Sequence, residues 1–193
     1  MGIRLNKDKL QLSQEVTRYM GLDLTKHGLQ PDSRKLIAIS EMAPPADKQA
    51  LLRMLGTVGF LARFCPGNSE VTSVLRQLLN EDSEFRWIDD THGAAWRRLK
   101  NILTSAPVLQ YYDVTQPVVI QADASTSGIG AVIMQNGREI EYASRALTRI
   151  ERDSYAQIER ELAAVLFALE RLTHIFMGSR MLPYKQITRR CWH

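Results

Sequence analysis

The dipeptide Asn136-Gly137 is the sequence feature that most constrains the fold of this chain. Both residues tolerate positive φ, and the pair is the strongest short signal for a tight β-hairpin. An apolar run over 129–134 precedes the pair, and an alternating run over 138–142 follows it. A further apolar run lies at 118–122. These runs predict three antiparallel strands.

Two carboxylates flank this predicted sheet. Asp123 ends the first strand, and Glu161 lies in a long amphipathic helix expected to start near Asp153 and to run to about Phe176. The predicted apolar stripe of that helix comprises Ile158, Leu162, Val165, Leu166, Leu169 and Leu172. Because Glu161 flanks the stripe, its side chain can reach the sheet edge where Asp123 emerges. The two could share a divalent metal, although Asp123 also suits a turn and Glu161 a solvated helix face.

The amino-terminal part predicts strands and a short helix. Residues 19–24 resemble a strand, and residues 26–29 resemble a hairpin turn closed by Gly28. Asp32 or Ser33 is expected to cap a helix over 34–40, before a stiff proline-containing linker.

A helical hairpin is predicted next. Asp47 and Ser69 are the expected caps, and Gly56 and Gly59 suggest close packing against another element. The expected buried residues are Leu51, Leu52, Leu55, Val58, Gly59 and Ala62 on the first helix, and Val71, Val74, Leu75, Leu78 and Leu79 on the second. The basic residues expected on outer faces are Arg53, Arg63, Lys48 and Arg76. They form either a solvated face or a set of phosphate contacts along a duplex.

The tandem acids Asp89-Asp90 resemble the metal-binding pair of polymerases only superficially. The residues that follow them, 94–99, are helical in character rather than part of a strand hairpin. The pair is therefore interpreted as a helix cap, and the helix is expected to end near 105–107.

Composition and charge exclude several classes of protein. The chain has 193 residues, 45% of them hydrophobic and 24% charged, which is typical of a globular protein. No apolar run approaches a membrane span, and the amino terminus lacks a signal peptide. With two cysteines, Cys65 and Cys191, an intracellular location, cytoplasmic or nuclear, is expected. The formal net charge of +4 is weakly suggestive of a nucleic-acid partner.

Several phrases along the chain together resemble the reverse transcriptase–ribonuclease H region of gypsy-class long-terminal-repeat retrotransposon polyproteins. They occur in the family's order and at nearly its spacing, from about residue 10 to residue 178. The phrases are Tyr19-Met20-Gly21, Gly28-Leu29-Gln30-Pro31-Asp32, Leu55-Gly56 with Phe60-Leu61-Ala62-Arg63-Phe64, Thr104-Ser105-Ala106-Pro107-Val108-Leu109, Asp123-Ala124-Ser125 with Gly128-Ile129-Gly130-Ala131-Val132, Tyr142-Ala143-Ser144-Arg145-Ala146-Leu147, and Tyr155-Ala156-Gln157-Ile158-Glu159-Arg160-Glu161-Leu162.

The resemblance implies an α+β architecture and a division of labour. Residues 1–43 are similar to the end of the polymerase palm, 44–80 to the helical thumb, and 81–115 to the connection. Residues 116–178 resemble the first part of a ribonuclease H fold, with three antiparallel strands and a long helix. Residues 179–193 form a basic tail outside the family pattern.

The resemblance also implies a chemistry. Family members perform RNA-directed DNA synthesis and hydrolyse the RNA of RNA–DNA hybrids with two Mg²⁺ ions held by clustered carboxylates. Asp123 then corresponds to the first-strand Asp and Glu161 to the first-helix Glu, both as metal ligands and catalytic residues. Arg53 and Arg63 are the expected contacts to an RNA–DNA hybrid or template–primer duplex. Other retroelement pol chains are further expected partners, and a membrane is not.

The chain departs from the family at both active sites. The polymerase Asp-Asp hairpin is absent, and no Asp or Glu follows Glu170 to supply the third ribonuclease H carboxylate. The strand that carries that carboxylate is expected to be missing, which would expose an edge of the first strand. We therefore expect a catalytically incomplete, truncated fragment. The alternatives are a non-catalytic nucleic-acid-binding module, which uses the thumb-like hairpin and Arg189 and Arg190, and a subunit completed by another chain.

Overall fold

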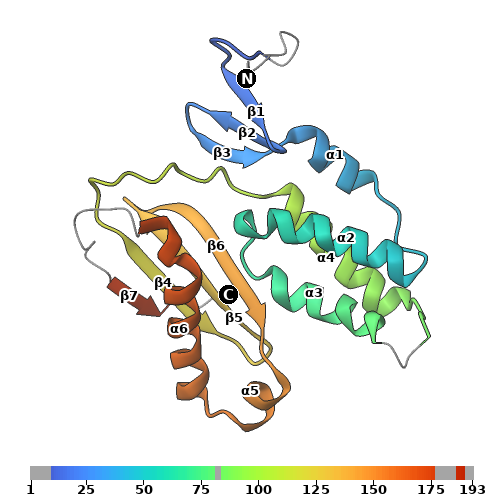
Figure 1. Cartoon of the computed structure of the whole chain (residues 1–193). Coiled ribbons are helices and arrows are strands. Elements are labelled where there is room, and N and C mark those ends of the chain that lie inside the picture. The colour runs from blue at the N-terminus through green and yellow to red at the C-terminus, as the bar shows by residue number, and fades with distance from the viewer. Residues whose placement is uncertain (1–9, 81–83, 177–185, 190–193) are drawn as a thin grey trace, which may run out of the picture.

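The computed structural model describes residues 10–80, 84–176 and 186–189, and it has α+β architecture. A three-stranded sheet of order β1-β2-β3 lies at the amino-terminal end, and a four-stranded sheet of order β6-β5-β4-β7 lies towards the carboxyl end. Figure 1 shows helices α2, α3 and α4 grouped beside the larger sheet, and α6 running along that sheet. Residues 1–9 and most of the predicted basic tail, Arg190 included, lie outside the described residues.

The amino-terminal sheet is a meander of β1 (Val16–Tyr19), β2 (Leu22–Thr25) and β3 (Gly28–Pro31). The single strand predicted over 19–24 was wrong, because Met20 and Gly21 adopt φ of 49° and 79° and turn the chain. The turn at Gly28 is confirmed, with φ of 139°. Leu29 and Leu109 exchange backbone hydrogen bonds of 2.8 Å, which join this sheet to the segment that precedes β4.

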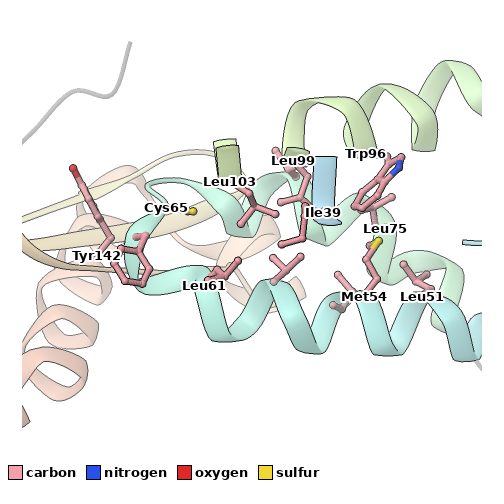
Figure 2. Packing of buried hydrophobic residues seen from close by; sticks show 14 of the residues in the cluster. Ile39, Leu51, Met54, Leu61, Cys65, Leu75, Trp96, Leu99, Leu103 and Tyr142 are labelled. Atoms are coloured by element: carbon pink, nitrogen blue, oxygen red, sulfur yellow. The ribbon is translucent and has the colours of Figure 1, made fainter. Parts of the chain in front are cut away.

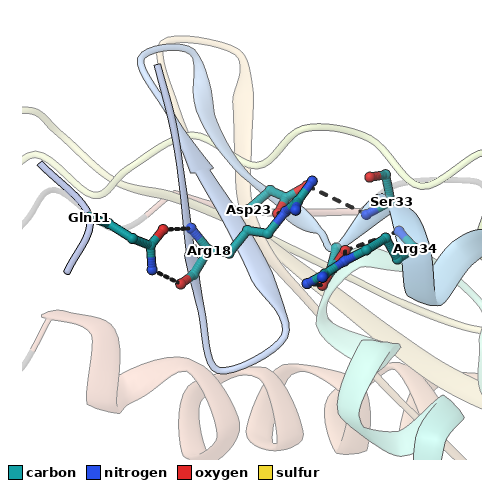
Figure 3. A network of polar contacts seen from close by, with 6 residues as sticks. Gln11, Arg18, Asp23, Ser33 and Arg34 are labelled. Atoms are coloured by element: carbon teal, nitrogen blue, oxygen red, sulfur yellow. Dashed lines mark hydrogen bonds and ion pairs between the residues drawn. The ribbon is translucent and has the colours of Figure 1, made fainter. Parts of the chain in front are cut away.

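A polar network holds this meander to α1 (Ser33–Glu41). Figure 3 shows Asp23 between Arg18 and the start of the helix. The Asp23 carboxylate is 3.4 Å from Arg18 Nε and accepts from the Ser33 backbone N–H at 3.4 Å. The Gln11 side chain makes two 2.9 Å hydrogen bonds with the backbone of Arg18. The predicted cap of α1 is confirmed as Asp32.

The helical hairpin consists of α2 (Lys48–Leu61), the 3₁₀ turn η2 (Ala62–Phe64), α3 (Asn68–Arg76) and the 3₁₀ turn η3 (Gln77–Leu79). Asp47 caps α2, as predicted, by accepting from the Ala50 N–H at 2.6 Å. The cap of α3 is Gly67 rather than Ser69, because Gly67 takes the left-handed conformation and α3 begins one residue before Ser69.

The buried face of α2 differs from the predicted stripe. Its buried residues are Leu51, Met54, Leu55, Val58 and Leu61. Leu52 is exposed, and a Cβ at Gly56 or Gly59 would meet open space, so neither glycine marks a close helix contact. The i, i+3, i+4, i+7 spacing that begins at Leu51 gives a narrower stripe than the one predicted, which explains the difference.

Helix α4 (Ala94–Thr104) completes this helical layer. A π-helical turn, η4 (Asp89–Gly93), leads into it, and its N-cap residue is Ile88, which makes no side-chain cap. The Asp89-Asp90 pair therefore lies in the first turn rather than at the cap, and Asp89 pairs with Arg97 at 3.3 Å. The end of α4 near residue 105 is confirmed.

The core of the helical layer extends onto the larger sheet. Figure 2 shows Trp96, Leu99 and Leu103 of α4 beside Leu75 of α3 and the buried face of α2, with Tyr142 at one end. Tyr142 belongs to β6, so its burial in this cluster joins helices and sheet. Cys65 is also buried here, and burial raises the pKa of its thiol to about 12, which keeps the thiol protonated.

The larger sheet contains β4 (Val119–Ala124), β5 (Gly128–Gln135) and β6 (Arg138–Ala146), all antiparallel neighbours. The predicted hairpin at Asn136-Gly137 is confirmed, with φ of 52° and 74°. Asp123 pairs with Gly130 in the β4–β5 register.

A fourth strand, β7 (Gln186–Arg189), runs parallel to β4. Its register joins Val119 to Gln186 and Ala122 to Arg189. The three predicted antiparallel strands are present, and β7 adds a parallel strand beside them. The prediction that an edge of β4 is exposed was wrong, because β7 pairs with that edge. The hydrogen bonds between β4 and β7 join backbone groups, so they do not require the side chains that the family carries at these positions. A segment with a divergent sequence can therefore still form this strand.

Two helices follow β6 where one was predicted. α5 (Arg149–Ser154) begins with a capping box between Thr148 and Glu151, and α6 spans Gln157–Phe176. Helix α6 buries Ala164, Ala168 and Leu172 in the core it forms with the sheet. Ile158, Leu162 and Leu166 of the predicted stripe are exposed. The helix instead turns the side that carries the two small alanines towards the strands, which allows a close approach.

Among the helices in the described ranges, none combines the length and apolar character that crossing a membrane requires.

Candidate metal and nucleic-acid site

Asp123 lies on the face of the sheet that is turned towards the helical layer. Its neighbours Ala122 and Ala124 pack in the core under α6. Side chains alternate along a strand, so Asp123 points to the opposite face. There it lines a cavity of about 270 Å³ between the sheet, α3 and α4, together with Glu70, Arg98 and Tyr142.

The turn after Asp123 is held by a carboxylate that sequence reasoning missed. Glu70 Oε1 on α3 accepts from Ser125 Oγ at 2.7 Å and from Ser127 Oγ at 2.9 Å. Ser125 N donates to Gly128 O at 2.8 Å, which closes the turn. Glu70 carried no local signal beyond a place in the first turn of a helix, because its partners lie more than 50 residues away.

Glu161 approaches the same end of β4 from α6. Gln157 Nε2 donates to Ala124 O at 3.3 Å and to Glu161 Oε1 at 3.1 Å. Glu161 lines a shallow depression on α6 with Ile158, Leu162 and Val165. The two predicted carboxylates therefore lie near one strand end, but they border different hollows on different sides of the sheet.

The described residues do not fit a two-ion Mg²⁺ centre. Such a centre needs several carboxylates that converge, because oxygen ligands must neutralise two neighbouring cations. Within the described ranges, no three His, Cys, Asp or Glu side chains gather closely enough to hold a metal ion. On β7, the residue in register with Ala122 is Arg189, and Ala122 faces away from Asp123, so this position adds no acid beside Asp123.

The two arginines expected to contact nucleic acid occupy unlike environments. Arg53 is exposed on α2 and borders a surface groove with Pro44, Pro45 and Thr57. Arg63 is only partly exposed, and its guanidinium donates to the buried Glu141 carboxylate on β6. Arg53 therefore remains available for a phosphate contact, and Arg63 joins the helical hairpin to the sheet.

A model of a known protein family matches part of this chain. Residues 88–182 match the model of the RNase H-like domain found in reverse transcriptase. This region, just under half of the chain, is similar to an RNase H-like domain of the reverse transcriptase type, in agreement with the broader part of the sequence-based expectation.

Particular relatives extend the similarity over nearly all of the chain. It is 25% identical over 189 residues to the Transposon Tf2-3 polyprotein and, equally, to the Transposon Tf2-4 polyprotein of Schizosaccharomyces pombe. The match covers 95% of this chain but only 14% of each polyprotein, so the chain spans about one seventh of these relatives.

Solved structures share the fold. The foamy viral protease-reverse transcriptase in complex with an RNA/DNA hybrid matches with a TM-score of 0.82 and 22% identity, over 94% of this chain and 25% of that chain. The foamy viral protease-reverse transcriptase in complex with double-stranded DNA matches with a TM-score of 0.79 and 21% identity, over 93% of this chain and 37% of that chain.

Proposed function

We propose that this chain is the palm-end, thumb, connection and RNase H-like part of a gypsy-class retroelement reverse transcriptase. In this proposal it holds a nucleic-acid duplex, and it does not hydrolyse RNA by itself. The proposed divisions are 1–43, 44–80, 81–115 and 116–178. The observation that carries the proposal is the position of Asp123 and Glu161 near one strand end, with no third converging acid in the part of the chain that the structure describes.

The arrangement of carboxylates around Asp123 supports the proposed lack of RNA hydrolysis. Family chemistry uses Mg²⁺ to activate water and to stabilise the leaving oxygen, which requires a dense cluster of carboxylates. Asp123 shares its cavity with Glu70, but Glu70 accepts hydrogen bonds from two serines of the β4–β5 turn.

Three observations support duplex binding. The foamy viral reverse transcriptases that share the fold were solved with an RNA/DNA hybrid and with double-stranded DNA. Arg53 is exposed on the thumb-like helix α2. The chain as a whole carries a formal net charge of +4, which favours association with phosphates.

A cleavage assay tests the proposed lack of hydrolysis. The purified chain is incubated with an end-labelled RNA–DNA hybrid and Mg²⁺, and the RNA is resolved on a denaturing gel. We expect intact RNA. Cleavage that Asp123→Asn abolishes, and that Glu170→Gln on the exposed side of α6 leaves unchanged, would contradict the proposal.

A binding assay tests the duplex-holding role separately. Fluorescence anisotropy with a labelled RNA–DNA hybrid measures affinity across a series of salt concentrations. If Arg53 contacts a phosphate, Arg53→Ala weakens binding and reduces the slope of log K against log salt by about 1. Salt-independent binding, or an unchanged slope in the variant, would remove Arg53 from the interface.

Association with other pol chains is a further part of the proposal. A partner that supplies the missing carboxylate would restore Mg²⁺ affinity only in the mixture. Calorimetric titration of Mg²⁺ into each chain alone and into the mixture distinguishes this arrangement from a module that only binds nucleic acid.

A further inference from the structure

The cavity beside Asp123 is lined by groups of both charges. Asp123 and Glu70 border it, and so does Arg98 of α4. No described residue donates a hydrogen bond to the Asp123 carboxylate, so both of its oxygens are available to a ligand. Glu70 uses Oε1 for the two serines of the β4–β5 turn, and its Oε2 has no donor in the same part of the chain. The cavity therefore offers hydrogen-bond acceptors that the described residues leave unused.

Arg98 supplies donors to the same cavity. Its neighbour Arg97 pairs with Asp89 at 3.3 Å, but no described acid forms an ion pair with Arg98. Arginine presents several N–H donors in a fixed plane, and it binds a phosphate or two neighbouring acceptors on a base. A ligand of this cavity can therefore donate to the carboxylates and accept from the guanidinium.

The size and the walls of the cavity suit a small ring. Ile102 of α4 and Tyr142 of β6 contribute apolar surface. Gly130 pairs with Asp123 across β4 and β5, so the cross-strand neighbour of the carboxylate has no side chain to fill the space. The volume of about 270 Å³ lies just below the range of pockets for drug-sized ligands, which favours a single small ring system.

From this combination we infer that the cavity binds a guanine base that carries a phosphate. Guanine presents two neighbouring donors, N1–H and N2–H, which match the two oxygens of one carboxylate. Its O6 and N7 accept from an arginine, and a phosphate does so as well. Adenine and cytosine have a ring-nitrogen acceptor beside their amino group, and this acceptor would face the carboxylate oxygens. The guanine base is therefore the one that fits the charges of the cavity best.

Other classes of ligand leave charged groups unsatisfied. A purely apolar molecule would cover the carboxylates and the Arg98 guanidinium without hydrogen bonds, and a simple anion would meet Asp123 and Glu70. The guanine base belongs either to a free nucleotide or to an unpaired position of the nucleic acid that we propose this chain holds. Only the second source rests on the proposed function.

Binding of free nucleotides tests the site directly. The 5′-monophosphates of guanosine, inosine and adenosine are titrated into the full chain in EDTA, and ligand-observed NMR or calorimetry measures the affinity. Inosine differs from guanosine only in lacking the N2 amino group. We expect the guanosine nucleotide to bind at least about tenfold more tightly than the other two, because each of them loses a hydrogen bond to a charged group.

Variants locate the binding in the cavity. Gly130→Val adds a side chain beside Asp123 and should abolish binding, while a β-branched residue remains compatible with the strand. Asp123→Asn replaces an acceptor oxygen with a donor and should remove the preference for guanosine over inosine. Arg98→Met should weaken the guanosine nucleotide by about tenfold, whereas Arg97→Met, which alters a residue outside the cavity lining, should not change its affinity. Circular dichroism melting confirms that each variant is folded.

Several results would overturn the inference. Equal affinity for the guanosine and inosine nucleotides would remove the carboxylate contact, and undetectable binding of all three at millimolar concentration would remove the site. Binding that survives Gly130→Val in a folded protein would place the nucleotide elsewhere. An effect of Arg97→Met as large as that of Arg98→Met would show non-specific attraction to the phosphate.

A second comparison distinguishes the two sources of the base. RNA–DNA hybrids that end in an unpaired guanosine or an unpaired adenosine are compared by fluorescence anisotropy. Tighter binding of the guanosine-ended hybrid, lost in Gly130→Val, assigns the base to nucleic acid, and equal binding of the two hybrids assigns the site to a free nucleotide. A chain that binds no duplex at all would contradict the proposed function but would leave the expected affinity for the free guanosine nucleotide unchanged.

Discussion

The guanidinium of Arg63, just after α2, donates to the carboxylate of Glu141 on β6, 78 residues further along the chain. The Glu141 side chain is only 9% exposed, whereas that of Arg63 is 40% exposed. Nearby, Ser144 Oγ of β6 donates to Asn68 Oδ1 of α3 at 3.0 Å. These contacts, with the buried Tyr142, join the helical layer to the larger sheet.

Removing the arginine of this pair should destabilise the protein. Arg63→Met leaves the Glu141 carboxylate buried without its cation, and we expect the free energy of unfolding to fall by about 1.5–3 kcal/mol. Urea unfolding measures the change. Arg53→Met, on an exposed part of α2, should stay within about 0.5 kcal/mol of the wild type. The double variant Arg63→Met/Glu141→Gln should lose less than the sum of the two single variants, and strict additivity would show that the pair is not coupled.

Acid should weaken the contact between β6 and α5. The Arg145 guanidinium donates to the Glu151 carboxylate and thereby lowers the pKa of Glu151 from 4.5 to about 2. A carboxylate with a lowered folded-state pKa stabilises the fold fully above its unfolded pKa, and it loses this contribution as pH falls from about 4.5 towards 2.

The variant Glu151→Gln isolates this effect, because Gln can keep the capping box with Thr148 but has no charge. The pKa of Asp32 is also lowered to about 2, chiefly by its hydrogen bond from Arg34, but Asp32 is present in both proteins. Melting temperatures measured from pH 6 to pH 2 should converge as the pH falls. Parallel curves would contradict the prediction.

Substituting alanine for glycine should change the stability of the protein in opposite directions at two positions. A Cβ at Gly28 would lie 2.1 Å from the carbonyl oxygen of Leu109, and the φ of 139° disfavours any side chain. Gly28→Ala should therefore cost at least about 2 kcal/mol and loosen the bridge to Leu109. Gly56→Ala lies in the interior of α2 with open space around it and should stabilise by about 0.5–1 kcal/mol. Chemical denaturation of both variants checks the signs.

An added acid beside Asp123 should improve Mg²⁺ binding. Thr188→Asp introduces a carboxylate at the β7 position that pairs with Gln121, which lies on the same face of β4 as Asp123. One more carboxylate close to the ion contributes on the order of 1–2 kcal/mol even at a water-like dielectric, so we expect Mg²⁺ to bind about tenfold more tightly by calorimetry. Gln186→Asp adds an acid at the far end of the same strand and serves as the control. Equal Mg²⁺ affinities in the two variants would indicate that β7 does not border the Asp123 site.

Local features of this protein were determined by adjacent residues. The Asn136-Gly137 turn, the Asp47 cap and the turn at Gly28 depend on backbone preferences of one to four residues, and the sequence alone predicted them. The same holds for the place of Asp123 at a strand end and of Glu161 in the first half of a helix.

Only the tertiary structure decided how these parts meet. Pairs such as Arg63 with Glu141, and Glu70 with Ser125, join residues far apart in sequence and leave no local pattern. The orientation of α6 was missed because Ala164 and Ala168 permit a closer approach to the sheet than the larger aliphatic residues of the predicted stripe. Asp123 and Glu161 border different hollows because the direction of a side chain depends on its place in the strand alternation or on the rotation of its helix. Residue type alone does not set that direction.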